Sequence, residues 1–177
     1  MERLVLSFNK MDDVREANLQ KDEFKALPDD VQAELEKHRQ QYLTDPAAAH
    51  YWDPIVIGTP GGPVATLLLH HKGRKSGQWR NTALQYYRVK GDILIVASRG
   101  GTENHPVWFL NLEAHPQCKI QVGANGSEAT ARVITGEARK EYWDAITAEQ
   151  PAQAEYQTRC KREIPVVALD LPDGVEL

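Results

Sequence analysis

The order of hydrophobic and polar positions divides the chain into a helical first part and a strand-rich remainder. Residues 12–43 are highly charged and are interrupted by Pro28. After this proline, a narrow face recurs at helical spacing, formed by Val31, Leu35, His38 and Tyr42. We expect this helix to pack on the body of the domain, with a partner-binding role as the alternative. The charged positions between them, Glu34, Glu36, Lys37 and Arg39, are expected to form a solvated face.

From residue 64 onward the period changes to that of short strands. The expected strands are residues 64–69, 80–88, 93–98, 119–122, 129–133 and 164–169. The Asn125-Gly126 dipeptide predicts a hairpin turn, and Pro165 suits an edge strand because proline cannot donate to a ladder. Shorter helical patterns follow Pro106, Gly136 and Pro151.

Short strands at hairpin spacing favour an antiparallel sheet over parallel units. The predicted fold class is therefore mainly β with helical additions (α+β), a small β-barrel of about six antiparallel strands. The predicted division is an N-terminal helical extension over residues 1–50 and a barrel domain over residues 51–177. The extension could act as a lid, dock on a membrane surface or complete the barrel.

Composition narrows the classes of function. The chain has 177 residues and a net charge of −4, which disfavours a nucleic-acid binder. No apolar run is long enough to cross a bilayer, so no integral membrane segment is expected, whereas peripheral membrane contact stays open. Cys118 and Cys160 form no disulfide framework, which predicts a cytoplasmic protein with inert thiols. No set of His, Cys and carboxylate residues has metal-ligand spacing, so no metal is expected.

Positive charge is concentrated in one glycine-flanked turn, against the negative average of the chain. The turn and the start of the next strand carry Arg74, Lys75, Ser76 and Arg80. Guanidinium groups bind phosphate or carboxylate in bidentate fashion, and glycine lets the backbone approach a ligand closely. A solvated hairpin tip is the alternative interpretation of this segment alone.

A second glycine-rich segment follows a predicted strand. It runs from Ala97 to Gly101, with a hydroxyl at Ser98 and a cation at Arg99, and a helix begins just after it. Helix starts present free N–H groups and attract anions. Trp108 or Phe109, on the first turns of that helix, could wall a flat aromatic ligand. Together the two segments predict a site for a planar molecule with an anionic tail.

These motifs, in this order, resemble the deazaflavin-dependent nitroreductase family. The resemblance rests on residues 73–77, 98–101 and 104–112, and it continues through residues 141–143 and 164–167. It implies an FMN-binding-like split β-barrel and an oxidoreductase that passes a hydride from reduced coenzyme F420 to an electron-poor acceptor. The acceptor would be a small molecule: a quinone, an activated enone or a nitro compound.

The resemblance also implies roles for individual residues. The coenzyme would be held by Arg74, Lys75, Ser76 and Arg80 at its tail, and by Asn81, Thr82, Ala83, Leu84, Gln85, Val96, Ala97, Ser98, Arg99, Val107, Trp108, Phe109, Leu110 and Asn111 around its ring. Ser98 is the candidate catalytic hydroxyl, and Ser98, Gln153 and Tyr156 would contact the substrate. Nitroreducing members carry tyrosines where this chain has Gln150 and Gln153, a departure that favours another acceptor.

Two alternatives remain at this point. The first is an FMN-dependent reductase or oxidase on the same barrel, and the second is a non-catalytic F420 carrier. The sequence does not indicate an oligomeric state.

Overall fold

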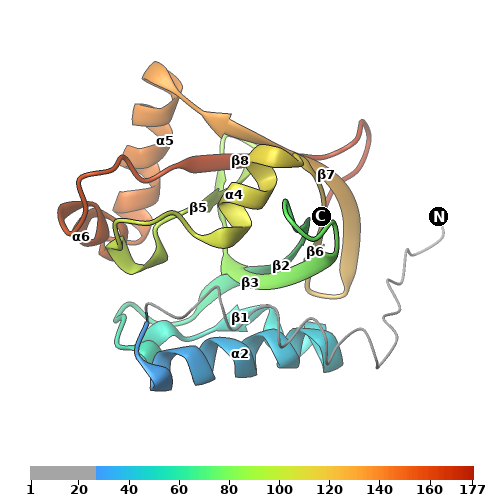
Figure 1. Cartoon of the computed structure of the whole chain (residues 1–177), viewed down its shortest axis with the longest axis horizontal. Coiled ribbons are helices and arrows are strands. Elements are labelled where there is room, and N and C mark those ends of the chain that lie inside the picture. The colour runs from blue at the N-terminus through green and yellow to red at the C-terminus, as the bar shows by residue number, and fades with distance from the viewer. Residues whose placement is uncertain (1–26) are drawn as a thin grey trace.

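The computed structural model describes residues 27–177, and its centre is one antiparallel sheet. Among these residues the strands are β1 (Tyr51–Trp52), β2 (Val64–Lys72), β3 (Trp79–Gln85), β4 (Tyr87–Val89), β5 (Asp92–Val96), β6 (Gln117–Val122), β7 (Asn125–Ile134) and β8 (Val166–Asp170). They follow the order β1-β2-β6-β7-β8-β5-β4, with β3 paired to β2. Figure 1 shows the sheet curled on itself as a half-barrel. The predicted fold class is confirmed.

Helices cover the open sides of this sheet. They are α2 (Asp29–Thr44), α3 (Pro46–Ala49), α4 (Val107–Ala114), α5 (Gly136–Glu149) and α6 (Ala152–Thr158), with single 3-10 turns at η1 (Pro54–Ile57) and η2 (Arg99–Gly101). In Figure 1, α2 runs beneath β1 and β3, α4 crosses the curl of the sheet, and α5 and α6 stand together at one end.

The strand β2 is buried on both faces, which explains its unbroken apolar run. Leu67 and Leu69 belong to the main core inside the curl, together with Ile95, Trp108 and Ile120. The residue between them, Leu68, points to the other face and packs with Tyr42 and Ala49. Because side chains alternate along a strand, this pattern requires a covering element on each side, and α2 is the outer one.

The helix α2 packs on the barrel through the predicted narrow face. Tyr42 is fully buried and donates its hydroxyl hydrogen to the carbonyl of Thr66. The His38 ring stacks on Trp52 at 4.8 Å between centroids. The prediction that Arg39 lies on a solvated face is wrong: it is 1% exposed. Arg39 donates to Asn81 Oδ1 at 2.6 Å and pairs with a carboxylate one turn earlier, so its charge is satisfied.

Three local predictions are corrected. The strand β8 is not an edge strand, because it pairs with both β5 and β7, and Pro165 lies just before it. The hairpin between β6 and β7 turns at residues 123–124, since Val122 already faces Asn125. The strand expected over residues 80–88 breaks at Tyr86, where the chain leaves β2 and begins to pair with β5.

Candidate functional site

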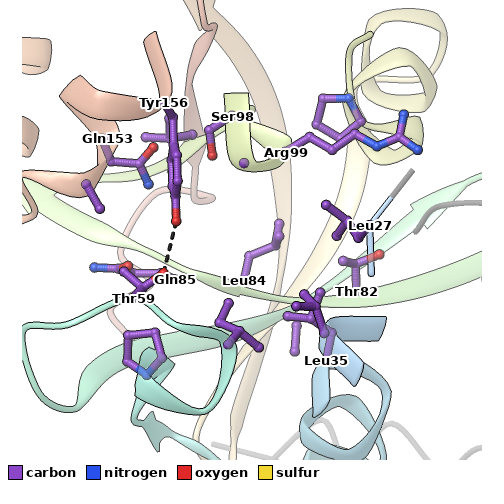
Figure 2. A pocket seen from close by; sticks show the side chains of 18 of the residues that line it. Leu27, Leu35, Thr59, Thr82, Leu84, Gln85, Ser98, Arg99, Gln153 and Tyr156 are labelled. Carbon is purple, nitrogen blue, oxygen red and sulfur yellow. Dashed lines mark hydrogen bonds between the residues drawn. The ribbon is translucent and has the colours of Figure 1, made fainter. Parts of the chain in front are cut away.

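A pocket of about 480 Å³ opens between β3 and the segment that follows β5. Its size is that of a typical small-molecule site. Four groups of residues line it. The strand β3 contributes residues 82–85, and the end of β5, the segment after it and the start of α4 contribute 96, 98–100, 106 and 108. The helix α2 and the two residues before it contribute 27, 28, 31, 35 and 38, and the region of α6 contributes 150, 152, 153, 156 and 159. The lining is completed by five residues from β1 to β2: Trp52, Pro54, Ile57, Thr59 and Thr66. Figure 2 shows Leu35 and Leu27 on one side and Ser98 with Tyr156 on another.

The pocket runs along an unpaired edge of β3. Among residues 27–177, β3 pairs with β2 alone. Thr82 and Leu84 point to one face of the strand and Ala83 and Gln85 to the other, yet all four line the pocket. A ligand there can therefore reach the backbone N–H and C=O groups of the free edge as well as these side chains.

The 98–106 segment, which forms the opposite wall, has a backbone suited to glycine. Arg99, Gly100 and Gly101 have φ values of 46°, 63° and 80° in the left-handed region. A Cβ on Gly101 would lie 2.4 Å from the carbonyl oxygen of Tyr156. The chain can therefore pass this close to α6 only with glycine here.

Arg162 makes several of the hydrogen bonds that hold this segment in place. Arg162 donates from Nε to the carbonyl of Thr102 at 2.8 Å, from Nη1 to that of Ala97 at 3.1 Å, and from Nη2 to that of Ser98 at 2.8 Å. Its Nη1 also lies 3.2 Å from His105 Nδ1. Arg162 was not predicted as a site residue, because no local pattern connects it to a segment about sixty residues away.

Two residues that line the pocket carry buried polar atoms without hydrogen-bond partners among the described residues. Gln153 is 7% exposed; its Nε2 donates to the Tyr87 hydroxyl at 3.1 Å, and its Oε1 is buried with no hydrogen-bond partner. Arg99 Nε is likewise buried and unpaired. Buried polar groups are nearly always hydrogen-bonded, so an unpaired acceptor and donor on the wall of one pocket point to a polar ligand.

A hydrogen bond joins two walls of the pocket. The hydroxyls of Tyr156 on α6 and Thr59 in the loop after η1 lie 3.0 Å apart, as the dashed line in Figure 2 shows. Tyr156 also lies beneath the guanidinium of Arg159, 5.2 Å from the ring centroid. The predicted substrate residue is therefore fixed from both sides.

The basic turn adjoins the pocket but does not line it. Arg74, Lys75 and Ser76 are exposed, and Arg74 donates from its backbone N and its Nη1 to Asn111 Oδ1 on α4. The turn is tight at Gly73, where a Cβ would lie 2.5 Å from Ser76 Oγ and 3.2 Å from the carbonyl oxygen of Gln78. Arg80 stands two residues before Thr82 on the same face of β3, so its Cα is about 7 Å farther along the strand.

The structure divides the predicted site residues into two groups. Those it brings together around the pocket are Thr82, Ala83, Leu84, Gln85, Val96, Ser98, Arg99, Trp108, Gln153 and Tyr156. Those outside the lining are Arg74, Lys75, Ser76, Arg80, Asn81, Ala97, Val107, Phe109, Leu110 and Asn111. Within the second group, Asn81 turns to the opposite face of β3 and binds Arg39, and Phe109 belongs to the main core.

The α2 residues that line the pocket were not predicted as site residues. Leu27, just before α2, and Val31 and Leu35 on it give the pocket apolar lining, and Figure 2 shows Leu27 and Leu35 across the pocket from Ser98 and Tyr156. The helical period at positions 31 and 35 predicted a buried face, but only the fold shows that part of this face borders a cavity.

The buried histidines beneath the site are neutral. Burial lowers the pKa of His71 to about 3 and that of His70 to about 4. Both lie under 3% exposed. Burial also raises the pKa of the Cys118 thiol to about 12, which leaves it protonated. Among residues 27–177 there is no metal-like group of three His, Cys, Asp or Glu, and none of the helices there is long and apolar enough to span a membrane.

Comparison with known proteins assigns the family. The model of the F420H(2)-dependent quinone reductase family matches residues 53–170. The chain belongs to this family. A curated F420H(2)-dependent quinone reductase of Mycobacterium tuberculosis is 39% identical over 114 residues, which cover 62% of this chain and 75% of that protein. The chain is thus an F420-dependent oxidoreductase, and the expected resemblance and coenzyme are confirmed.

Solved structures agree with this assignment. An F420-H2 dependent reductase, FDR-A, superposes with a TM-score of 0.55 at 36% identity and covers 59% of this chain and 93% of its own. A second solved structure, described as a domain-swapped dimer, has the same TM-score and identity, and the match covers 59% of this chain and 79% of that one. The helix α2 lies before the residues that the family model matches, so the α2 wall is outside that shared region.

Proposed function

We propose that this oxidoreductase reduces a quinone-type acceptor in the pocket between β3, the 98–106 segment, α2 and α6. The observation that carries this proposal is a pocket with both polar and apolar walls on β3, the strand that follows the exposed basic turn. Reduced F420 supplies a hydride to an electron-poor carbon, and the residues of this chain bind and orient the two reactants.

The residues present fit such a coenzyme. Its phosphate and carboxylates require cations; Arg80 lies on β3, which walls the pocket, and Arg74 and Lys75 lie in the turn before this strand. Its planar ring requires an apolar slot with a few polar contacts, which Leu84, Trp108 and the unpaired Gln153 Oε1 provide. The free edge of β3 adds backbone groups along the ring. Arginine matches phosphate and carboxylate geometry with charge-assisted hydrogen bonds, so the turn is suited to hold the tail.

Ser98 is placed to act on the acceptor. Its side chain lines the pocket, the residue is 8% exposed, and Arg162 holds its carbonyl. We assign to its hydroxyl the hydrogen bond to the acceptor oxygen that gains negative charge during hydride transfer. A fixed donor in a water-poor site stabilises such charge without reorganising.

The acceptor itself is proposed to lie between α6 and α2. Gln153 and Tyr156 offer polar atoms on the α6 side, whereas Val31 and Leu35 offer an apolar wall on the α2 side. A quinone has carbonyl oxygens on an apolar ring, and this division of polar and apolar walls matches it.

Binding measurements on paired variants test this assignment. Replacing Lys75 and Arg80 together by Ala removes two charge-assisted contacts worth about 1.5–3 kcal/mol each, so the F420 dissociation constant should rise at least about 100-fold. The control replaces Arg132 and Lys140, cations on β7 and α5, by Ala. Fluorescence titration with F420 and separately with FMN measures both. Unchanged F420 affinity in the first variant, or tight FMN binding without F420 binding, would contradict the proposal.

We also propose a cytoplasmic location. Cys118 and Cys160 are free and buried thiols, as is usual in a reducing compartment. Labelling the protein in intact and lysed cells with a membrane-impermeant reagent would test it, and labelling in intact cells would contradict it.

A further inference from the structure

Four polar residues form a continuous chain from the basic turn to the pocket. Asn111 Oδ1 accepts from the backbone N of Arg74 at 3.1 Å and from its Nη1 at 3.2 Å. Asn111 Nδ2 lies 3.0 Å from His71 Nδ1, and His71 Nε2 lies 3.2 Å from Thr82 Oγ1. Asn111, His71 and Thr82 are each at most 2% exposed, and Thr82 lines the pocket.

The direction of every hydrogen bond in this chain is determined by its first member. A backbone N–H and a guanidinium can only donate, so the Asn111 atom facing Arg74 must be the oxygen. The Asn111 amide nitrogen then faces His71 and donates, which makes His71 Nδ1 an acceptor without a proton. A neutral ring carries its one proton on the other nitrogen, so His71 Nε2 donates to Thr82 Oγ1.

This direction leaves the Thr82 hydroxyl hydrogen available. Within residues 27–177, the contact with His71 is the one hydrogen bond recorded for this hydroxyl. Thr82 Oγ1 accepts there, so its own O–H is free to donate elsewhere, and Thr82 borders the pocket. Accepting a hydrogen bond also polarises a hydroxyl and makes it a better donor.

We propose that His71 and Asn111 are positioning residues that turn the Thr82 hydroxyl into a fixed hydrogen-bond donor for a carbonyl oxygen of the bound ligand. The carbonyl belongs either to the coenzyme ring or to the quinone acceptor, and the two sources share this chemistry. The ligand part of this inference rests on the proposed function, whereas the direction of the chain does not.

The state of the His71 ring tests the direction without any ligand. Nitrogen-15 NMR of the histidine rings at pH 8 should show His71 neutral, with the proton on Nε2 and none on Nδ1. A proton on Nδ1 would overturn the inference. Because this measurement uses the protein alone, it stands whether or not the protein binds F420.

Thr82→Val tests the donor role, since valine keeps the shape and suits a strand. We expect a 3- to 10-fold rise in one of two constants, the loss typical of one neutral hydrogen bond. A rise in the F420 dissociation constant identifies the coenzyme carbonyl, and a rise in the KM for a soluble naphthoquinone at saturating reduced F420 identifies the acceptor carbonyl. Thr82→Ser, which retains the hydroxyl, should restore most of the loss.

Thr130→Val, at an exposed position of β7, is the matched control and should change neither constant. If Thr82→Val also changes neither, the donor role is refuted. If the wild-type protein does not bind F420, the proposed function fails, and the ring measurement still decides the direction of the chain.

Asn111→Asp reverses the direction of the hydrogen bonds from residue 111 to Thr82. It therefore tests whether Asn111 and His71 position the Thr82 hydroxyl or only support the fold. A carboxylate oxygen facing His71 accepts where the amide donated, so the neutral ring must move its proton to Nδ1. His71 Nε2 then accepts from Thr82, and the pocket loses its donor. The variant should show the shifted ring proton and the same 3- to 10-fold loss, with no further loss when combined with Thr82→Val. An unshifted ring proton, or losses that multiply in the double variant, would overturn the positioning role.

Discussion

The hydrogen bonds from Arg162 to the 98–106 segment and to Ala97 give the most specific mutational prediction. Replacing Arg162 by Met keeps much of the side-chain bulk and removes the hydrogen bonds to the carbonyls of Ala97, Ser98 and Thr102. A hydrogen bond to a charged group contributes about 1.5–3 kcal/mol. At the low end, three such bonds would contribute about 4.5 kcal/mol in total. The guanidinium is partly solvated and the freed carbonyls can take up water, so we expect less than this sum, a total loss of about 3 kcal/mol in the free energy of unfolding.

The same substitution should also reduce catalysis. The segment carries Ser98 and Arg99 to the pocket, and a small misplacement of such groups is costly. We expect kcat/KM for a quinone to fall about tenfold, equivalent to about 1.4 kcal/mol of transition-state stabilisation. Arg162→Lys should recover less than half of either loss, because one ammonium cannot span carbonyls that a planar fork reaches.

Arg132→Met is the matched control. Arg132 makes a bidentate pair with Asp170 at 2.8 and 2.9 Å, but its side chain is 53% exposed. Exposed pairs contribute about 1 kcal/mol or less. Urea unfolding and steady-state kinetics on both variants give the comparison. Equal stability and equal kcat/KM in the two would refute the argument that Arg162 organises the site.

Three further outcomes are expected. The pKa values of His70 and His71, about 4 and about 3, lie below the ordinary value, so these rings take up protons in the unfolded chain first as the pH falls below about 6.5. Each histidine should therefore lower the free energy of unfolding by about 2 kcal/mol between pH 7.5 and pH 5, as measured by urea unfolding. A free energy of unfolding that does not change over this range would contradict their burial as neutral rings. Leu35→Ala should raise the KM for the acceptor several-fold with little change in F420 affinity, because α2 borders the proposed acceptor space; an effect confined to F420 binding would contradict that placement. Ser98→Ala should lower kcat about 10- to 100-fold with F420 affinity nearly unchanged, and equal losses in both would contradict its role at the acceptor.

The strands and helices were largely readable from local pattern, because each is a short run with its own period. The errors arose where the pairing between strands determines the local structure. Pro165 suggested an edge strand, but it precedes β8, and β8 lies between two neighbours. The Asn125-Gly126 dipeptide is a strong turn signal, yet the register with β6 places the turn at residues 123–124. Register depends on long-range packing that a dipeptide does not contain.

The site was predictable only in part for the same reason. Gly100 and Ser98 belong to motifs that are local in sequence, so their segment could be recognised, and the pocket includes them. Arg162 and Leu35 reach the site through the fold: no local pattern marks Arg162, and the helical period at Leu35 predicts a buried position but not a pocket. Arg39 lies among charged residues typical of a solvated helix, but Asn81 on β3 gives it a buried partner.

A crystal structure of the protein with F420 tests the central claim most directly. We predict the flat ring of the coenzyme along the free edge of β3, between Thr82 and Ser98, and its phosphate and carboxylates within hydrogen-bond distance of Lys75 and Arg80. A ring bound outside this pocket, or a tail directed away from the basic turn, would contradict the account.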